Sequence, residues 1–126
     1  MGVFAATLMN SQEEYDVSIE EIHHTEKKDS PSGTAITIAE QILQQITRKT
    51  KWVNNASNVT QELAILSKRI DPAAGTHKIK YSSSVDDIEI IHTAHSRQGF
   101  AKGAVLAAEF LQGKKGIFTM KDVLGF

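Results

Sequence analysis

The stretch YDVSIEEIHHTEKKDSPSGTAITIAEQILQQI, residues 15–46, changes from a strand pattern to a helix pattern and decides the fold class. In its first part Tyr15, Val17 and Ile19 alternate with polar residues, as the two faces of a half-buried strand require. In its last part apolar residues recur at the spacing of one helix face, namely at Ala35, Ile38, Ala39, Ile42, Leu43 and Ile46. The stretch therefore predicts a strand, a polar connection and a helix.

A Ser-Pro-Ser-Gly sequence lies where this helix is predicted to begin. Either Ser30 caps the helix, with Pro31 at the first helical position, or Ser32 caps it one step later. Both alternatives leave free backbone N–H groups around Gly33 and Thr34. Such groups can bind a carboxylate or a phosphate.

Further strand patterns follow in the second half of the chain. Strands are predicted at residues 63–69, 76–83 and 88–94, the last two as a hairpin, with a short strand at Trp52 inside a polar loop and a helix over residues 100–111 that ends near Gly113. Residues 1–10 have a helical composition but form too short a segment to predict. This order of elements predicts an α+β fold with a mixed, largely antiparallel sheet and helices packed on one face. The sequence contains no GxGxxG fingerprint, so no Rossmann domain is predicted.

Length and composition are those of one ordinary globular domain, so we expect one compact unit. The chain has 126 residues, of which 40% are hydrophobic and 23% charged, and its formal net charge is -1. A net charge near zero gives no general attraction to nucleic acid or to anionic lipid, which favours a small-molecule partner. The absence of cysteine excludes disulfides and thiolate metal sites. No apolar run of membrane-spanning length and no signal sequence occurs, which predicts a cytoplasmic location.

The connection between strand and helix carries the residues that are best suited to chemistry. The run EIHHTEKKDSPSGTA, residues 21–35, contains two histidines and two lysines just before the helix N-terminus. Histidine exchanges protons near its ordinary pKa of about 6.5, and lysine supplies a charge or a proton. A helix N-terminus adds N–H donors and about half a positive charge. Together they suit a dicarboxylate substrate, whereas the plain structural alternative is a strand end followed by a solvated turn.

The same residues suggest two other kinds of site. The five histidines come without a HExxH helix or cysteine ligands, so a metal site is disfavoured and none is predicted. His77 and His92 fall on the predicted hairpin strands, where a structural, hydrogen-bonded histidine is the more common outcome. A phosphate at the SPSGT helix start stays open as an alternative to a carboxylate, although the full GxxxxGK[ST] loop is missing.

The same run resembles the signature of the 4-hydroxy-tetrahydrodipicolinate reductase family, also called dihydrodipicolinate reductases. Further segments resemble the same family, so that the likeness covers nearly the whole chain. They are GTHKIKY at residues 75–81, IEIIHTAHSRQGFAKGAVLAAEFL at residues 88–111 and GIFTMKDVLGF at residues 116–126. The resemblance implies an enzyme of lysine and diaminopimelate biosynthesis that reduces an unsaturated dicarboxylate ring with NADH or NADPH.

By this resemblance, His23 is the proton donor or acceptor and Lys27 the second proton donor. The residues expected to bind substrate are His24, Ser32, Gly33 and Thr34. The family's N-terminal dinucleotide-binding domain has no counterpart in this sequence, so residues 1–126 are expected to form the substrate-binding and tetramerisation domain of a homotetramer. The residues that choose between NADH and NADPH are expected in the other half of the enzyme. The alternative is a module that assembles and binds a dicarboxylate without turnover.

Overall fold

The computed structural model describes residues 2–125, which form four helices and five strands. In chain order they are α1 (Gly2–Met9), β1 (Asp16–His23), α2 (Gly33–Leu43), β2 (Lys51–Val53), β3 (Glu62–Arg69), β4 (Thr76–Ser82), β5 (Asp87–Thr93), α3 (Gln98–Leu111) and α4 (Met120–Leu124). Internal contacts divide the chain into two compact units, Met1–Thr93 and Ala94–Phe126, rather than the single unit that its length suggests. The physical reason is that neither α3 nor α4 has a buried residue, so the described core belongs to the first unit.

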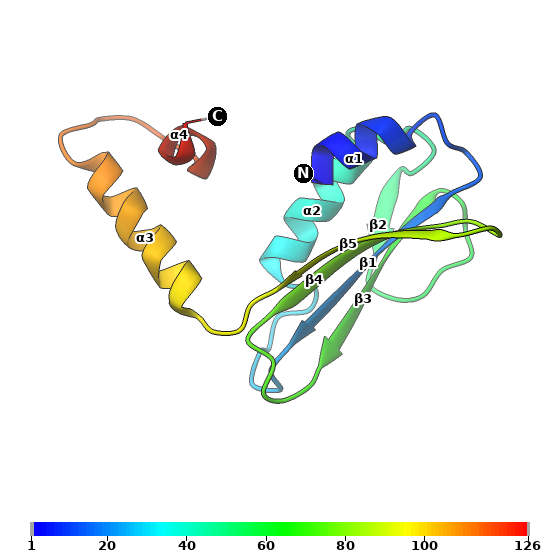
Figure 1. The fold of residues 1–126 in the computed structure, drawn as a ribbon, viewed down its shortest axis with the longest axis horizontal. Helices are drawn as coiled ribbons and strands as arrows, with labels where there is room; N and C mark the ends of the chain where they lie inside the picture. Colours follow the sequence, from blue (N-terminus) through cyan, green and yellow to red (C-terminus); the bar gives the residue numbers. More distant parts are fainter. Residues whose placement is uncertain (1, 126) are drawn as a thin grey trace. The chain divides into compact units, whose positions relative to one another are not determined.

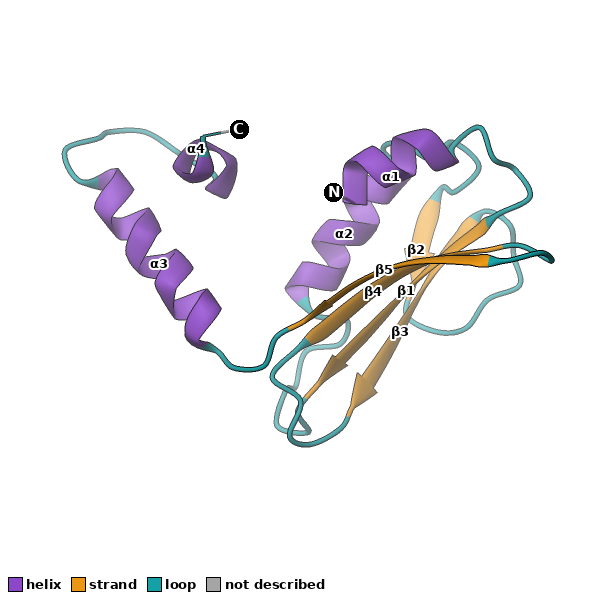
Figure 2. Ribbon diagram, in the orientation of Figure 1, coloured by secondary structure: helices purple, strands orange, loops and turns teal. Residues whose placement is uncertain are grey.

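One five-stranded sheet forms the framework of the first unit, in the order β2-β3-β1-β4-β5 (Figure 2). Strand β3 runs parallel to both β1 and β2, whereas β4 is antiparallel to both β1 and β5. The predicted α+β class and mixed sheet are therefore confirmed, although parallel and antiparallel pairings are equally frequent. Strand β1 has a parallel neighbour, β3, on one side and an antiparallel neighbour, β4, on the other. Beside the last residues of β1, strand β3 therefore ends and strand β4 begins.

The core lies between the sheet and α2 (Figure 1). Helix α2 contacts β1, β2 and β3, and α1 packs on α2, so both helices belong to the same side, as predicted. Alternate residues of β1 face this layer, and Val17 and Ile19 are each 1% exposed. Glu21 continues the same alternation and is 0% exposed. A carboxylate therefore occupies a core position at the end of the strand.

Helix α2 begins where the serine-rich connection predicts. Ser32 is the N-cap, and its Oγ accepts a hydrogen bond from the backbone N–H of Ala35 at 3.2 Å. This decides between the two capping alternatives in favour of Ser32. Gly33 and Thr34 form the exposed first turn, whose leading N–H groups have no acceptor within the helix.

The opposite face of the sheet carries charged pairs and apolar side chains. Glu20 lies 2.5 Å from the Nζ of Lys68 and 3.5 Å from that of Lys78. Ile91, on the same face of the neighbouring strand β5, is 54% exposed. Among the described residues of the first unit, no helix covers this face.

The second unit consists of α3 and the short helix α4. The predicted helix over residues 100–111 is confirmed within α3, whereas α4 had no prediction in the C-terminal tail. Phe110 and Phe118 stack edge to face with their ring centroids 5.6 Å apart, and the Nζ of Lys114 lies 3.0 Å from the centroid of the Phe110 ring. Asp122 accepts a hydrogen bond from the backbone N–H of Thr119 at 2.6 Å and so caps α4. No helix among residues 2–125 is long and apolar enough to cross a bilayer.

Candidate functional site

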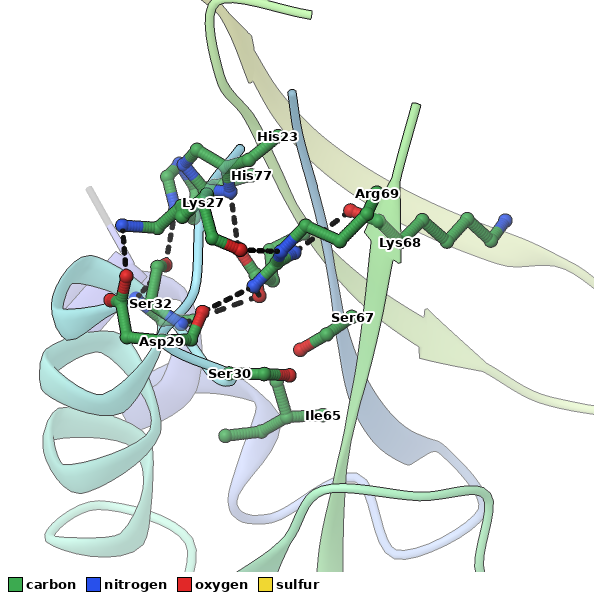
Figure 3. A network of polar contacts seen from close by, with 12 residues as sticks. His23, Lys27, Asp29, Ser30, Ser32, Ile65, Ser67, Lys68, Arg69 and His77 are labelled. Atoms are coloured by element: carbon green, nitrogen blue, oxygen red, sulfur yellow. Dashed lines mark hydrogen bonds and ion pairs between the residues drawn. The ribbon is translucent and has the colours of Figure 1, made fainter. Parts of the chain in front are cut away.

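The strand register gathers the ends of three strands around the start of α2 (Figure 3). His23 is the last residue of β1 and pairs with Arg69, the last residue of the parallel strand β3. His77 near the start of β4 pairs with Glu21, because β4 runs antiparallel to β1. Ser32, the N-cap of α2, contacts these strand ends, and its Oγ lies 3.1 Å from the Nε2 of His77.

The buried carboxylate of Glu21 is the centre of this polar network. Its Oε1 accepts hydrogen bonds from the Nη2 of Arg69 at 3.0 Å and from the backbone N–H of Ser32 at 3.3 Å. Its Oε2 is in contact with the Nδ1 of His23. Burial raises the pKa of the Glu21 carboxyl, but the nearby Ser67 hydroxyl and the hydrogen bond and positive charge of Arg69 outweigh burial and hold the pKa below its ordinary value. Glu21 is therefore ionised at neutral pH.

Two histidine rings meet beside this carboxylate. The rings of His23 and His77 are arranged edge to face, with their centroids 5.1 Å apart. Burial lowers the pKa of both side chains, and at His23 the charge of Glu21 opposes that effect without cancelling it. Both rings are therefore mainly neutral at pH 7, which is the state in which an imidazole can take up a proton.

Arg69 also holds the loop that carries Lys27. Its Nε donates to the carbonyl oxygen of Lys27 at 3.3 Å, and its Nη2 donates to that of Asp29 at 2.6 Å. The Nζ of Lys27 lies 2.8 Å from the Oδ1 of Asp29 (Figure 3). The loop is thus fastened to the end of β3 while the ammonium group of Lys27 stays partly exposed.

A glycine lies close to the Nε2 nitrogen of His23. Gly75 has φ +146°, a conformation that disfavours any side chain, and a Cβ atom there would lie 3.3 Å from the Nε2 of His23. The Nδ1 of the same ring faces Glu21. His23 therefore has one nitrogen bound to the protein and the other beside the smallest residue of the chain.

The structure gathers some of the predicted site residues and separates one. His23, Lys27 and Ser32 belong to the polar network, and Gly33 and Thr34 form the exposed start of the adjoining helix. His24 is the exception, because no described hydrogen bond or ion pair joins its side chain to the network. Its backbone carbonyl accepts from the N–H of Lys27 at 3.2 Å.

Three members of the network, Glu21, Arg69 and His77, are not among the site residues predicted from the sequence. Glu21 had a signal, because it lies in phase with Val17 and Ile19 on the buried face of its strand. Arg69 and His77 had none, because they lie more than 40 positions from His23 along the chain. The bond from His77 to Ser32 fits the structural role expected of this histidine.

Glu21, His23 and His77 also form a group that could hold a metal ion, with one ligand atom from each within 4.8 Å of the others. Two imidazoles and a carboxylate are a donor set that zinc accepts. However, the Glu21 oxygens are already bound to Arg69, Ser32 and His23. A divalent ion would have to compete with the guanidinium group, so the arrangement fits a hydrogen-bonded network better than a metal centre.

Comparison with known proteins identifies the family. The family model described as "Dihydrodipicolinate reductase, C-terminus" matches residues 2–124. The chain belongs to this family. It is 56% identical over 119 residues to the 4-hydroxy-tetrahydrodipicolinate reductase of Christiangramia forsetii, covering 94% of this chain and 49% of that protein. It is 41% identical over 116 residues to the enzyme of the same name from Methanosarcina mazei, covering 89% of this chain and 44% of that protein.

One solved structure has the same fold as this chain. It is the dipicolinate-bound dihydrodipicolinate reductase from Paenisporosarcina sp. TG-14, with a TM-score of 0.61 and 22% sequence identity. The match covers 93% of this chain and 48% of that chain. This chain therefore spans about half the length of the reductases that it matches and corresponds to their C-terminal part.

Proposed function

We propose that this chain forms the substrate-binding part of a 4-hydroxy-tetrahydrodipicolinate reductase, a cytoplasmic NAD(P)H-dependent oxidoreductase of lysine and diaminopimelate biosynthesis. The observation that carries the proposal is the polar network at the end of β1. It brings a neutral histidine, His23, and a loop lysine, Lys27, to the N-terminus of α2. The family membership of the chain supports the same function.

In this proposal His23 donates or accepts a proton beside the substrate ring, and Lys27 is the second proton donor. His24, Ser32, Gly33 and Thr34 hold the carboxylates of the substrate. The physical basis is that the exposed N-terminus of α2 offers N–H donors and partial positive charge, while Lys27 adds a full positive charge. A molecule with two carboxylates matches two such groups, and the solved relative of the same fold is described as bound to dipicolinate.

The residues of this chain do not fit a nucleotide cofactor. The connection from β1 to α2 reads HTEKKDSPS, residues 24–32, in place of the short glycine-rich turn that brings a pyrophosphate to a helix N-terminus. We therefore assign NADH or NADPH mainly to a dinucleotide-binding domain. The second candidate function is a module that assembles and binds a dicarboxylate without turnover, and nicotinamide absorbance after mixing NADPH and substrate with this chain distinguishes the two.

Binding of a dicarboxylate tests the proposal directly. In a calorimetric titration with pyridine-2,6-dicarboxylate, Lys27→Ala is expected to weaken binding about tenfold or more, since a charge-assisted hydrogen bond contributes about 1.5–3 kcal/mol. The matched control is Lys28→Ala, which removes an exposed lysine from the same loop and should leave the affinity unchanged. Equal affinity of the Lys27→Ala variant and the parent would refute the role of Lys27. No binding by the folded parent would favour a site that needs its second domain.

The proposal includes assembly of four copies through the face of the sheet that lies opposite α2. The support is that Ile91 is 54% exposed there, beside side chains of both charges that a second sheet could pair. Light scattering of the parent chain should give the mass of a tetramer, and Ile91→Lys should lower that mass because it puts a charge into an apolar contact. Val85→Lys, at an equally apolar but 89% exposed position in the β4–β5 turn, is the control. A monomeric parent chain would remove assembly from the proposal.

A further inference from the structure

Glu21 connects the two groups that the proposed reaction uses. Its Oε2 is paired with the Nδ1 of His23, whereas its Oε1 accepts from Arg69, which in turn donates to the backbone of the Lys27 loop. The carboxylate is completely buried and cannot reach a substrate. Any contribution that it makes to the reaction must therefore act through its neighbours.

We propose that Glu21 is a positioning residue: it fixes the tautomer and orientation of the His23 ring and, through Arg69, the place of the loop that carries Lys27. This inference rests on the proposed function, because it takes His23 as the group that exchanges a proton with the substrate. It assigns a separate and testable property to a residue that touches neither substrate nor cofactor.

The tautomer follows from the hydrogen-bonding capacity of the carboxylate. An ionised carboxylate accepts hydrogen bonds and has none to donate, so the Nδ1 of His23 must carry the proton that lies between the two groups. In the neutral ring the Nε2 then has a free lone pair, and this nitrogen lies next to Gly75. The ring is thus held with its unprotonated nitrogen toward Gly75, and this is the nitrogen that exchanges a proton in the proposed reaction.

The same contact serves both directions of proton transfer. When Nε2 takes up a proton, the positive ring stays paired with Glu21. When the proton moves to the substrate, the electron pair of the N–H bond stays on Nε2, the Nδ1 proton remains in place and the ring is neutral again. The groups that face His23 are Glu21 on its own strand, Arg69 on β3, His77 on β4 and Lys27 on the loop. Glu21 is the negative charge among these four.

Stability alone gives a weak reason to keep this carboxylate. Replacing a buried ion pair with apolar side chains of similar volume is often neutral or stabilising. The neighbouring positions on this face of β1 are already occupied by Val17 and Ile19. An apolar residue at position 21, with a matching change at Arg69, would therefore complete the core as well, which favours a functional reason for the charge.

The experiment is nitrogen-detected NMR of the histidine side chains in this chain, without cofactor or substrate. The parent should show His23 as the Nδ1–H tautomer. Glu21→Gln keeps the shape but removes the charge, and it should lower the pKa of His23 by about 1, the low end of the change that a close opposite charge produces. Glu20→Gln is the matched control, because this neighbouring carboxylate lies on the opposite face of β1, and it should leave His23 unchanged.

A double variant keeps the test independent of folding. Glu21→Leu combined with Arg69→Met removes both charges together, which a core tolerates better than the loss of one. It should fold, as judged by its amide spectrum, and should lose the preference for the Nδ1–H tautomer. In a full-length reductase Glu21→Gln should lower kcat by about 100-fold, within the range of general acid catalysis, with a smaller change in KM.

An Nε2–H tautomer in the parent, or an unchanged His23 pKa in Glu21→Gln, would overturn the inference. Failure of the proposed function has a different signature. If His23 is not the group that exchanges a proton with the substrate, the tautomer and pKa results hold in this chain, but kcat of the full-length reductase is unaffected by changes at His23.

Discussion

His23→Gln in a full-length reductase that contains this domain is expected to lower kcat by about 100- to 10,000-fold, the contribution of a positioned general acid or base. Glutamine matches the polarity of the ring but cannot be protonated at neutral pH. The loss should fall on kcat more than on KM, because the proton moves in the transition state and the carboxylate contacts lie on other residues. Steady-state oxidation of NADPH, followed by the absorbance of its nicotinamide ring, measures both constants.

His92→Gln is the matched control for this substitution. His92 pairs with His77 in the β4–β5 ladder and is exposed, so its loss should change kcat little. Light scattering should show that both variants keep the mass of the parent, which separates a chemical effect from an assembly effect. Parent-like kcat in His23→Gln would remove His23 from the proton-transfer role and leave Lys27 as the candidate.

Arg69→Met is expected to reduce the free energy of unfolding of this chain by about 3–5 kcal/mol, the cost of leaving a buried charge without its partner. The Glu21 side chain is 0% exposed and the Arg69 side chain 20%, so water does little to replace the lost guanidinium. The total stability of a small domain is only about 5–15 kcal/mol. Urea unfolding followed by circular dichroism should therefore show a large fall in the midpoint.

The pH dependence of this loss gives it a specific signature. In the parent the pKa of Glu21 lies below its ordinary 4.5, so the stabilisation by its ionised form is present above that value and is lost as the pH falls through the folded-state pKa. In Arg69→Met burial is less opposed and the pKa should rise. The difference between variant and parent should then shrink as the pH falls from 7 to about 5, because Glu21 can take up a proton.

The double variant Glu21→Leu with Arg69→Met serves as the control, since it should recover most of the lost stability by removing the second charge as well. A stability in Arg69→Met that equals that of the parent at pH 7 would mean that Glu21 is hydrated or otherwise compensated. The central place given to this ion pair would then be wrong.

Some features of the fold depend only on residues that are close together in the chain. The sequence predicts these features. The alternation in β1, the helical spacing in α2 and the short strand at Trp52 all appear in the structure. The sequence does not distinguish Ser32 from Ser30 as N-cap, because both serines satisfy the local capping rule and only the bond to Ala35 decides. The family assignment followed from the EIHHTEKKDSPSGTA run and its companions, and it is confirmed.

The residues of the site also fall into those that the sequence predicts and those that only the fold brings together. By itself the sequence determined that a histidine, a lysine and a helix N-terminus follow one another between residues 23 and 34, because these groups are adjacent in the chain. Only the tertiary structure decided that Arg69 and His77 join them. Their places depend on the register of β3 and β4 against β1, which arises from packing between distant segments. The role of Glu21 lies between these cases: its strand phase marks it as buried, but its charge has a purpose only once the pairing brings Arg69 and His23 to its two oxygens.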